Sequence, residues 1–165
     1  MSSRFFGVYR GKVESNLDPF KRGRVQVSVP EVFGDGRLLW AERCGGFAGN
    51  GVGGFAVPPV GTESWVQFER GDPDFPVLAG LSWKEGESPA PGIEQIKMLK
   101  TDTVTITVSD VPGNGGVTVE VEPPAVTMPI KFAMNSSGIE LSVGGSSIKL
   151  DGVSVSVNEG ALKVT

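Results

Sequence analysis

The alternation of apolar and polar residues in the last third of this chain is the feature that most constrains its fold. In residues 138–165, GIELSVGGSSIKLDGVSVSVNEGALKVT, glycines divide the chain into units of about six to eight residues. Because successive side chains point to opposite faces of a strand, this pattern predicts short strands that share one apolar face. The residues predicted to form that face are Ile139, Leu141, Val143, Ile148, Leu150, Val153, Val155, Val157, Leu162 and Val164.

An isolated ribbon of this kind is marginal in water, because it has two open edges and a bare aliphatic face. Burying ten aliphatic side chains contributes roughly 15–30 kcal/mol before ordering entropy is subtracted, and only if partners cover the face. We therefore predict that residues 101–165 form an intertwined trimeric β-helix or β-prism. In it, strand edges pair with the next chain and the apolar faces meet on the axis. The alternative is a small sandwich layer packed on the rest of the chain.

The first half of the chain also alternates with a period of two, and no stretch shows a convincing helical stripe. The predicted strands span residues 5–15, 23–30, 38–43, 63–69 and 76–83. Strong turn signals separate them, including NLDPFKRG and ERGDPDFP. Five short strands at this spacing predict a small closed barrel. Its expected heavy core residues are Trp40, Trp65, Phe68 and Trp83.

Composition divides the chain into two parts. The stretch KEGESPAPG, residues 84–92, is nearly free of apolar residues and is typical of a linker. We predict a barrel domain over 1–84, a linker over 85–100 and a spike domain over 101–165, so the fold class is all-β. Residues 93–100 could form a short helix. The glycine-dense segment 44–62 is interpreted as an apolar flap, and a phosphate-binding loop is disfavoured because no Lys-Ser/Thr pair or helix pattern follows it.

The absence of histidine excludes many enzyme mechanisms. The chain has no His and one Cys, which removes imidazole bases, Ser-His and Cys-His pairs, His-ligated zinc and disulfide frameworks. The carboxylate pairs Asp72/Asp74 and Glu120/Glu122 suit a glycosidase only weakly, because no apolar pocket is indicated around either pair. A cation site built from Asp35, Asp72 and Asp74 is equally weakly indicated. We predict a protein that is not an enzyme and has no cofactor or metal.

Two motifs in combination resemble a known family. They are DPFKRGRVQVSVP, residues 18–30, and PPVGTESWVQFERGDPDFPV, residues 58–77, together with the alternating tail. The chain resembles the central spike proteins of contractile phage tails and related injection machines, including the VgrG proteins of type VI secretion. The resemblance implies an OB-fold barrel followed by a trimeric β-helical needle.

The resemblance also implies partners. A homotrimer would dock under a baseplate hub linked to the tail tube, and would pierce the target cell envelope when the sheath contracts. Our candidates for hub docking are Phe47, Val52, Phe55, Lys21 and Arg22. A PAAR-type tip protein is expected on the needle end formed by Gly160, Ala161, Leu162, Lys163, Val164 and Thr165. The short linker leaves no room for a lysozyme domain between the two parts.

An OB-fold module that binds nucleic acid is the alternative function, because that fold often binds single strands. Residues 1–37 carry a local excess of basic residues, and aromatic residues lie among them. The net charge of −4 and the pI near 4.9 argue against a polyphosphate partner. We therefore predict no nucleic-acid partner. The N-terminus has no apolar run typical of a signal peptide, so synthesis in a cytoplasm is expected. The family resemblance implies that this cytoplasm is bacterial and that the protein is assembled into the baseplate of a phage virion or contractile injection particle.

Overall fold

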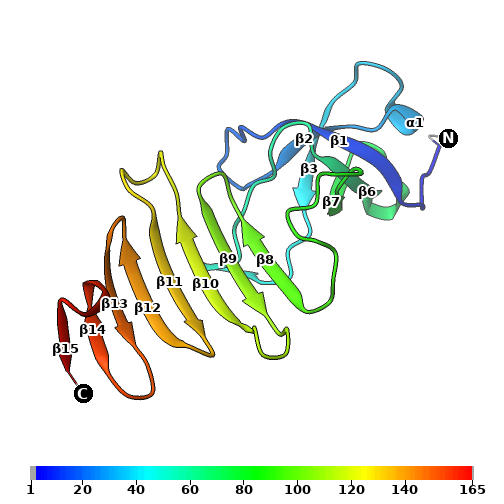
Figure 1. Cartoon of the computed structure of the whole chain (residues 1–165). Helices are drawn as coiled ribbons and strands as arrows, with labels where there is room; N and C mark the ends of the chain where they lie inside the picture. The colour runs from blue at the N-terminus through cyan, green and yellow to red at the C-terminus, as the bar shows by residue number, and fades with distance from the viewer. Residues whose placement is uncertain (1–2, 165) are drawn as a thin grey trace. The chain divides into compact units, whose positions relative to one another are not determined.

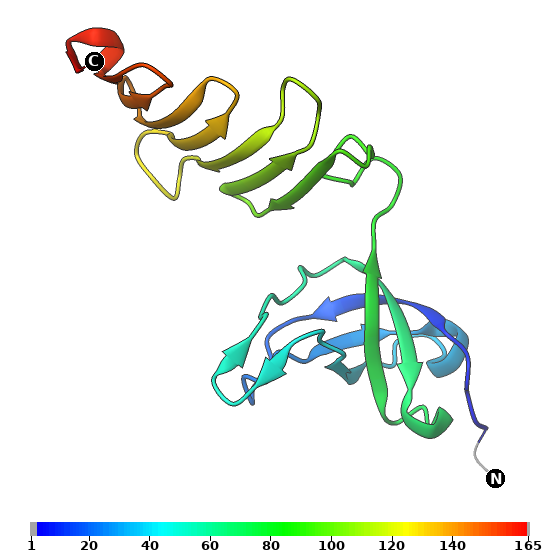
Figure 2. The same ribbon diagram turned by 90° about the horizontal axis from the view of Figure 1, so that it is seen from below.

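The computed structural model describes residues 3–164, and the chain divides into two compact units (Figures 1 and 2). The first is Met1–Glu87 and the second is Ser88–Thr165. Nearly all regular structure is β-strand, as the period-two pattern predicts. Among the described residues, no helix has the length and apolar character needed to cross a membrane.

The first unit is a closed barrel of five strands in the order β1-β2-β3-β7-β6. The strands are β1 (Tyr9–Ser15), β2 (Val25–Ser28), β3 (Leu39–Arg43), β6 (Glu63–Phe68) and β7 (Pro76–Ser82). Neighbours pair antiparallel except β3 and β7, which run parallel. The predicted five-stranded barrel is confirmed, with each strand inside its predicted range.

Small aliphatic side chains fill the barrel. The core residues are Val13, Val25, Val27, Val29, Ala41, Val66, Phe68 and Leu78. The prediction that Trp83 belongs to this core is wrong, since it is 70% exposed. Trp40 and Trp65 are half-buried, and the Arg10 guanidinium lies 3.9 Å from the Trp65 ring centre. The interior of a barrel of five short strands is narrow, so valine fills it and the indole rings stay outside.

Short elements connect the barrel strands. They are α1 (Pro30–Phe33), β4 (Ala48–Gly49), β5 (Val52–Gly53) and the 3-10 turn η1 (Glu69–Gly71). The glycine-dense segment forms the β4–β5 hairpin, and within residues 3–164 no α-helix follows it that could hold a phosphate. Phe47 and Val52 are exposed on and beside this hairpin, so in a single chain these apolar side chains do not cover an end of the barrel. Docking of the flap on another subunit stays a prediction.

The second unit is one antiparallel sheet of eight strands, ordered β15 to β8. The strands are β8 (Ile96–Lys100), β9 (Val104–Ser109), β10 (Gly116–Val121), β11 (Ile130–Asn135), β12 (Gly138–Val143), β13 (Ser146–Leu150), β14 (Val155–Val157) and β15 (Leu162–Val164), with the 3-10 turn η2 (Asn158–Gly160) before the last. Each strand pairs with its neighbours in the chain, so the strands from β9 to β14 are paired on both sides. The expected exchange of strand edges with other chains is therefore restricted to the outer edges of β8 and β15.

The segment 93–100 differs from its predicted structure. It was expected to allow a short helix and to belong to the linker, but residues 96–100 form β8 and pair with β9. Short apolar runs fit a helix and a strand equally well, and pairing with the neighbouring strand decides here for the strand. The sheet thus begins before residue 101, and the segment between the units is shorter than 85–100.

Candidate functional site: the open apolar face of the second sheet

The second sheet carries most of its apolar side chains on one face. Residues directly opposite one another on paired strands point to the same side of a sheet, so the pairing register defines rows of side chains that cross all the strands. The middle row is Leu99, Ile106, Val119, Phe132, Leu141, Ile148, Val157 and Leu162. It contains only apolar side chains from β8 to β15.

Two flanking rows extend this surface. One is Lys97, Val108, Val117, Met134, Ile139, Leu150, Val155 and Val164. The other is Val104, Val121, Ile130, Val143 and Ser146. We call the three rows together the apolar face. The opposite face is mostly polar, although Ile96, Met98 and Ala133 also lie on it. On this face Lys131 Nζ lies 2.9 Å from Glu120 Oε1.

The apolar face is uncovered in a single chain. Leu141 is 46% exposed and Ile148 is 51% exposed, although both lie in the middle row and not at an edge. They also line a shallow groove with Val143 and Val157. Monomeric soluble proteins rarely expose a contiguous apolar surface of this extent, so the face is built to be covered.

The structure places nine of the ten residues predicted for the trimer core on strands of this face. The tenth, Val153, lies in the turn between β13 and β14 and is 80% exposed. The alternation of apolar and polar residues alone assigned Val153 to the face. However, β13 ends at Leu150, and Asp151 and Gly152 belong to the turn. The face also includes residues that were not selected, such as Phe132 and Ile106. The same alternation in IKFAMN and TVTITV could have identified them.

The residues expected to contact a tip protein lie at the last strand. Gly160 ends η2, and β15 carries Leu162 and Val164, which belong to the apolar face. Thr165 lies outside the described residues. In the described chain, β15 is an outer strand of the sheet.

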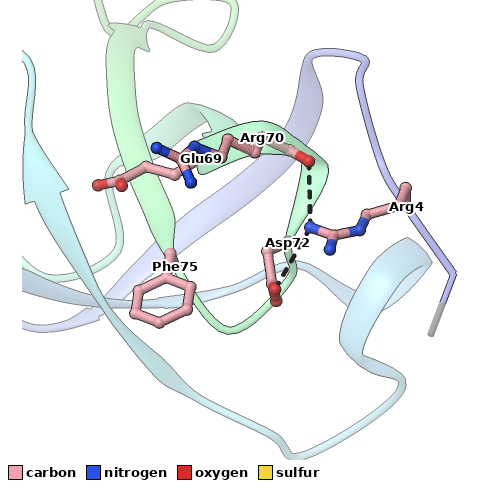
Figure 3. Close-up of a pocket in the computed structure, with 5 residues that line it drawn as sticks. All are labelled: Arg4, Glu69, Arg70, Asp72 and Phe75. Carbon is pink, nitrogen blue, oxygen red and sulfur yellow. Dashed lines mark hydrogen bonds and ion pairs between the residues drawn. The ribbon is translucent and has the colours of Figure 1, made fainter. Parts of the chain in front are cut away.

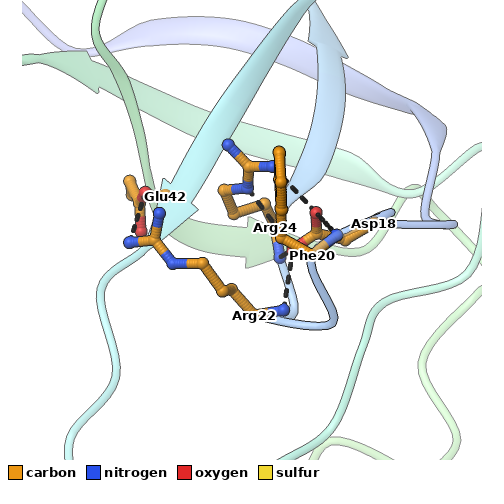
Figure 4. Close-up of polar contacts among 5 residues, drawn as sticks. All are labelled: Asp18, Phe20, Arg22, Arg24 and Glu42. Atoms are coloured by element: carbon orange, nitrogen blue, oxygen red, sulfur yellow. Dashed lines mark hydrogen bonds and ion pairs between the residues drawn. The ribbon is translucent and has the colours of Figure 1, made fainter.

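One carboxylate organises the DPFKRGR turn of the barrel unit (Figure 4). Asp18 Oδ2 accepts a hydrogen bond from the backbone N–H of Arg22 at 2.8 Å, and Oδ1 accepts one from Phe20 at 3.1 Å. Arg24 donates from Nη2 to Oδ1 at 2.8 Å and from Nε to Oδ2 at 3.3 Å. The Asp18 side chain is 3% exposed. The Arg24 guanidinium, supported by the backbone donors, holds the pKa of Asp18 well below its usual range against the effect of burial.

This turn supports part of the surface predicted to dock a hub. Gly23 has a φ of +76°, and a Cβ on it would lie 2.7 Å from Phe55 Cε2, so the Phe55 ring packs directly on the turn. The Arg43 guanidinium lies 6.0 Å from the centre of the same ring. The structure therefore brings Phe55 to the turn that carries Lys21 and Arg22.

The other hub candidates lie on the neighbouring hairpin. Phe47 precedes β4 and Val52 is in β5, and they are 65% and 60% exposed. Arg22 pairs with Glu42 through an Nη2–Oε1 distance of 2.8 Å. The hub candidates thus include three exposed apolar side chains, Phe47, Val52 and Phe55, and one basic residue, Arg22, whose charge is paired with that of Glu42.

A small polar pocket lies on the barrel beside the turn after β6 (Figure 3). Arg4 Nη1 lies 3.4 Å from Asp72 Oδ2 and donates to the carbonyl oxygen of Arg70 at 3.2 Å. Asp74 is bound instead by Arg37, with Nη2 2.6 Å from Oδ1. Each carboxylate of this predicted pair therefore has its own arginine, which suits a structural turn better than general acid catalysis.

The basic residues near the N-terminus are engaged in a similar way. Of the seven Lys and Arg residues among residues 1–37, five form ion pairs with carboxylates. Such pairing leaves little positive charge to neutralise phosphates, and it weakens the nucleic-acid alternative. Among residues 3–164, no cluster of three or more carboxylate or thiol side chains could hold a metal ion.

The fold and the apolar face define a class of protein. A small closed barrel followed in the chain by a sheet whose apolar face is bare in one copy is the architecture of a protein that works as an oligomer.

Comparison with protein families identifies the class more closely. Residues 9–83 match the model of the type VI secretion system and phage-baseplate injector OB domain. Residues 95–163 match the model of the phage baseplate V C-terminal trimerisation domain. The chain therefore belongs to the VgrG-like family of baseplate spike proteins of phages and type VI secretion systems, and the resemblance noted from its motifs is confirmed.

Curated relatives agree with this assignment. The chain is 42% identical over 69 residues to the type VI secretion system spike protein VgrG4b of Pseudomonas aeruginosa, a match that covers 41% of this chain. It is 30% identical over 90 residues, or 50% of this chain, to the actin cross-linking toxin VgrG1 of Vibrio cholerae serotype O1. The matched segment is 8% of the length of each relative.

Proposed function

We propose that this chain is the subunit of a homotrimeric central spike in the baseplate of a phage tail or a related contractile injection machine. The observation that carries the proposal is the apolar face, which is half-exposed in one chain and lies within the match to a trimerisation domain. In this proposal residues 1–84 act as a barrel domain, and the sheet that begins at β8 acts as the needle.

Three copies bury the face if their sheets form the three sides of a prism. The middle row of each sheet then points to the axis, where Phe132 is the largest side chain of the row. Because strand pairing is already complete within each chain from β9 to β14, the copies join through their faces and not by exchanging inner strands.

The proposed action is mechanical. The hydrogen bonds between strands run in the direction in which the sheet adds strands, which is the long direction of the needle. An axial load would therefore be carried by hydrogen-bond ladders on three sides and by a packed apolar interior. Such a needle can transmit the force of sheath contraction and pierce a cell envelope without a catalytic residue.

The barrel would attach the needle to the machine. The exposed Phe47, Val52 and Phe55, together with Lys21 and Arg22, suit an interface with the hub that continues into the tail tube. A PAAR-type tip protein on residues 160–165 would complete the spike. These partners are part of the proposal.

The first test is the mass of the purified full-length chain by size exclusion with light scattering. We expect three times 17.3 kDa, about 52 kDa, and a trimer that persists in mild SDS without boiling. A species of 17.3 kDa at micromolar concentration would contradict the proposed function.

A further inference from the structure

The sheet of the second unit has two long edges formed by its turns. One edge consists of the turns that follow β8, β10, β12 and β14, and we call it the 128 edge because Met128 lies on it. The other consists of the turns that follow β9, β11 and β13, and we call it the 153 edge because Val153 lies on it. Both edges carry an apolar residue where a polar turn residue is usual.

Val153 is held at the tip of its turn. The Asp151 carboxylate oxygen Oδ1 accepts hydrogen bonds from the backbone N–H of Val153 at 2.9 Å and of Ser154 at 2.7 Å. The backbone N–H of Asp151 donates in turn to the carbonyl oxygen of Ser154 at 3.0 Å. These bonds fix the turn while Val153 remains 80% exposed. Val153 is thus held in place by its turn and presents apolar surface that its own chain leaves largely uncovered.

Met128 is the corresponding feature of the opposite edge. It is 53% exposed and lies against the turn between β12 and β13, where a Cβ on Gly144 would be 2.9 Å from Met128 Sδ. The backbone N–H of Gly144 donates to the carbonyl oxygen of Pro129 at 3.0 Å, which ties the loop to that turn. Met128 therefore lies level with the turn between β12 and β13, one strand away from the turn that carries Val153.

Threefold closure brings unlike edges together. When three identical sheets form the sides of a prism, the 128 edge of each copy meets the 153 edge of the next, and equivalent residues stay at equal heights along the axis. Adjacent strands are about 4.8 Å apart, so Val153 of one copy and Met128 of the next differ in height by about one strand spacing. A methionine side chain spans that distance and adapts to an irregular gap.

We propose that Val153 of one copy packs against Met128 of the neighbouring copy and closes each corner of the needle. This contact rests on the trimer proposed above, and it specifies which residues meet where the edges of two neighbouring copies adjoin. It gives Val153 a place at a corner between chains, away from the axis.

The contact can be tested by cysteine cross-linking because it cannot form within one chain. The two residues lie on opposite edges of the same sheet, separated by a strand of five or six residues, or about 17–20 Å. A disulfide needs Cα atoms within about 7 Å. Any bond between positions 128 and 153 must therefore join two chains.

The experiment uses the full-length chain with the exposed native Cys44 replaced, Cys44→Ser, as the parent. The test variant adds Met128→Cys and Val153→Cys, and it is treated with a mild oxidant or a short bismaleimide. Each single variant is a control. A matched control combines Val153→Cys with Asp102→Cys, which lies on the same edge as Met128 but in the turn between β8 and β9.

We expect the double variant to give covalent dimers and a covalent trimer of about 52 kDa on boiled, non-reducing gels, with most of the monomer band lost. The single variants and the Asp102 control should remain monomeric on the same gels. A monomer band for the double variant, with a trimer mass by light scattering, would overturn the corner contact and leave the trimer standing. A parent that is monomeric by light scattering would overturn the trimer itself.

Discussion

Truncation of Leu141 to alanine tests whether the apolar face is buried between copies. Leu141 lies in the middle row, between Phe132 and Ile148 on the neighbouring strands. About half of its surface is exposed in a single chain, so the rest of its burial must come from assembly. Leu141→Ala should therefore weaken the trimer more than it weakens the fold of one chain.

The size of the effect follows from the number of copies. Leu→Ala costs about 2–5 kcal/mol at buried sites. Because Leu141 is 46% exposed in a single chain, we assign about 2 kcal/mol per chain of this cost to the free energy of trimer assembly. Three copies give about 6 kcal/mol per trimer, or about 10⁴ in the association constant at about 1.4 kcal/mol per tenfold. For a trimer the midpoint concentration of assembly varies as the inverse square root of this constant, so the midpoint should rise about 100-fold.

The assay is light scattering or mass photometry on a dilution series, with urea added equally to all samples if the wild type does not dissociate. The control is Ser142→Ala, one residue further along the same strand and on the polar face. We expect its midpoint to stay within a few-fold of wild type. Equal midpoints for Leu141→Ala and Ser142→Ala would refute the assignment of the apolar face to the trimer interior.

Two further predictions concern single residues, one in each unit. Asp18 has a lowered pKa in the folded chain, so its ionised form stabilises the barrel above its unfolded pKa of about 3.9, and this contribution is lost as the pH falls below that value. Asp18→Asn should lower the melting temperature at pH 7 and flatten its decline below about pH 4, measured by circular dichroism; parallel pH profiles for both chains would argue against this role. Gly138, the first residue of β12, has a φ of +123°, and a Cβ on it would overlap the carbonyl oxygen of Leu150. Gly138→Ala should destabilise the sheet by about 2–5 kcal/mol, whereas Gly145→Ala, with nothing within 4 Å of its Cβ, should melt near wild type; similar melting curves for the two variants would contradict the close contact.

The strands were predictable because alternation and turn chemistry agree along most of the chain. NLDPFKRG, for example, contains the Asp and Gly that form the turn between β1 and β2, and the structure adds that Asp18 also binds Arg24. The apolar face was predictable for the same reason, since period-two alternation fixes which side chains share a face once the register is set.

The remaining features depend on partners that a local pattern does not reveal. By alternation Val153 should point to the apolar face. Instead it lies in a turn, in which the carboxylate of Asp151 accepts a hydrogen bond from the backbone N–H of Val153. Trp83 has the size of a core residue, but a narrow barrel filled by valine has no room for it. The pairing of each strand with its chain neighbours is a long-range property, so alternation alone could not distinguish a continuous sheet from interwound chains.

The unbroken pairing order of the second sheet has a consequence for length. Each strand pairs only with the strands before and after it, so one hairpin can be added or removed without changing the pairing of the others. One hairpin adds two strand spacings, about 9.6 Å, and returns the chain to the edge from which it left. A single extra strand between β11 and β13 would instead send every later turn to the opposite edge, so Met128 and Val153 would lie on the same edge and the proposed corner contact could not form. The reach of such a needle can therefore change in steps of one hairpin, with each step repeating the same apolar rows.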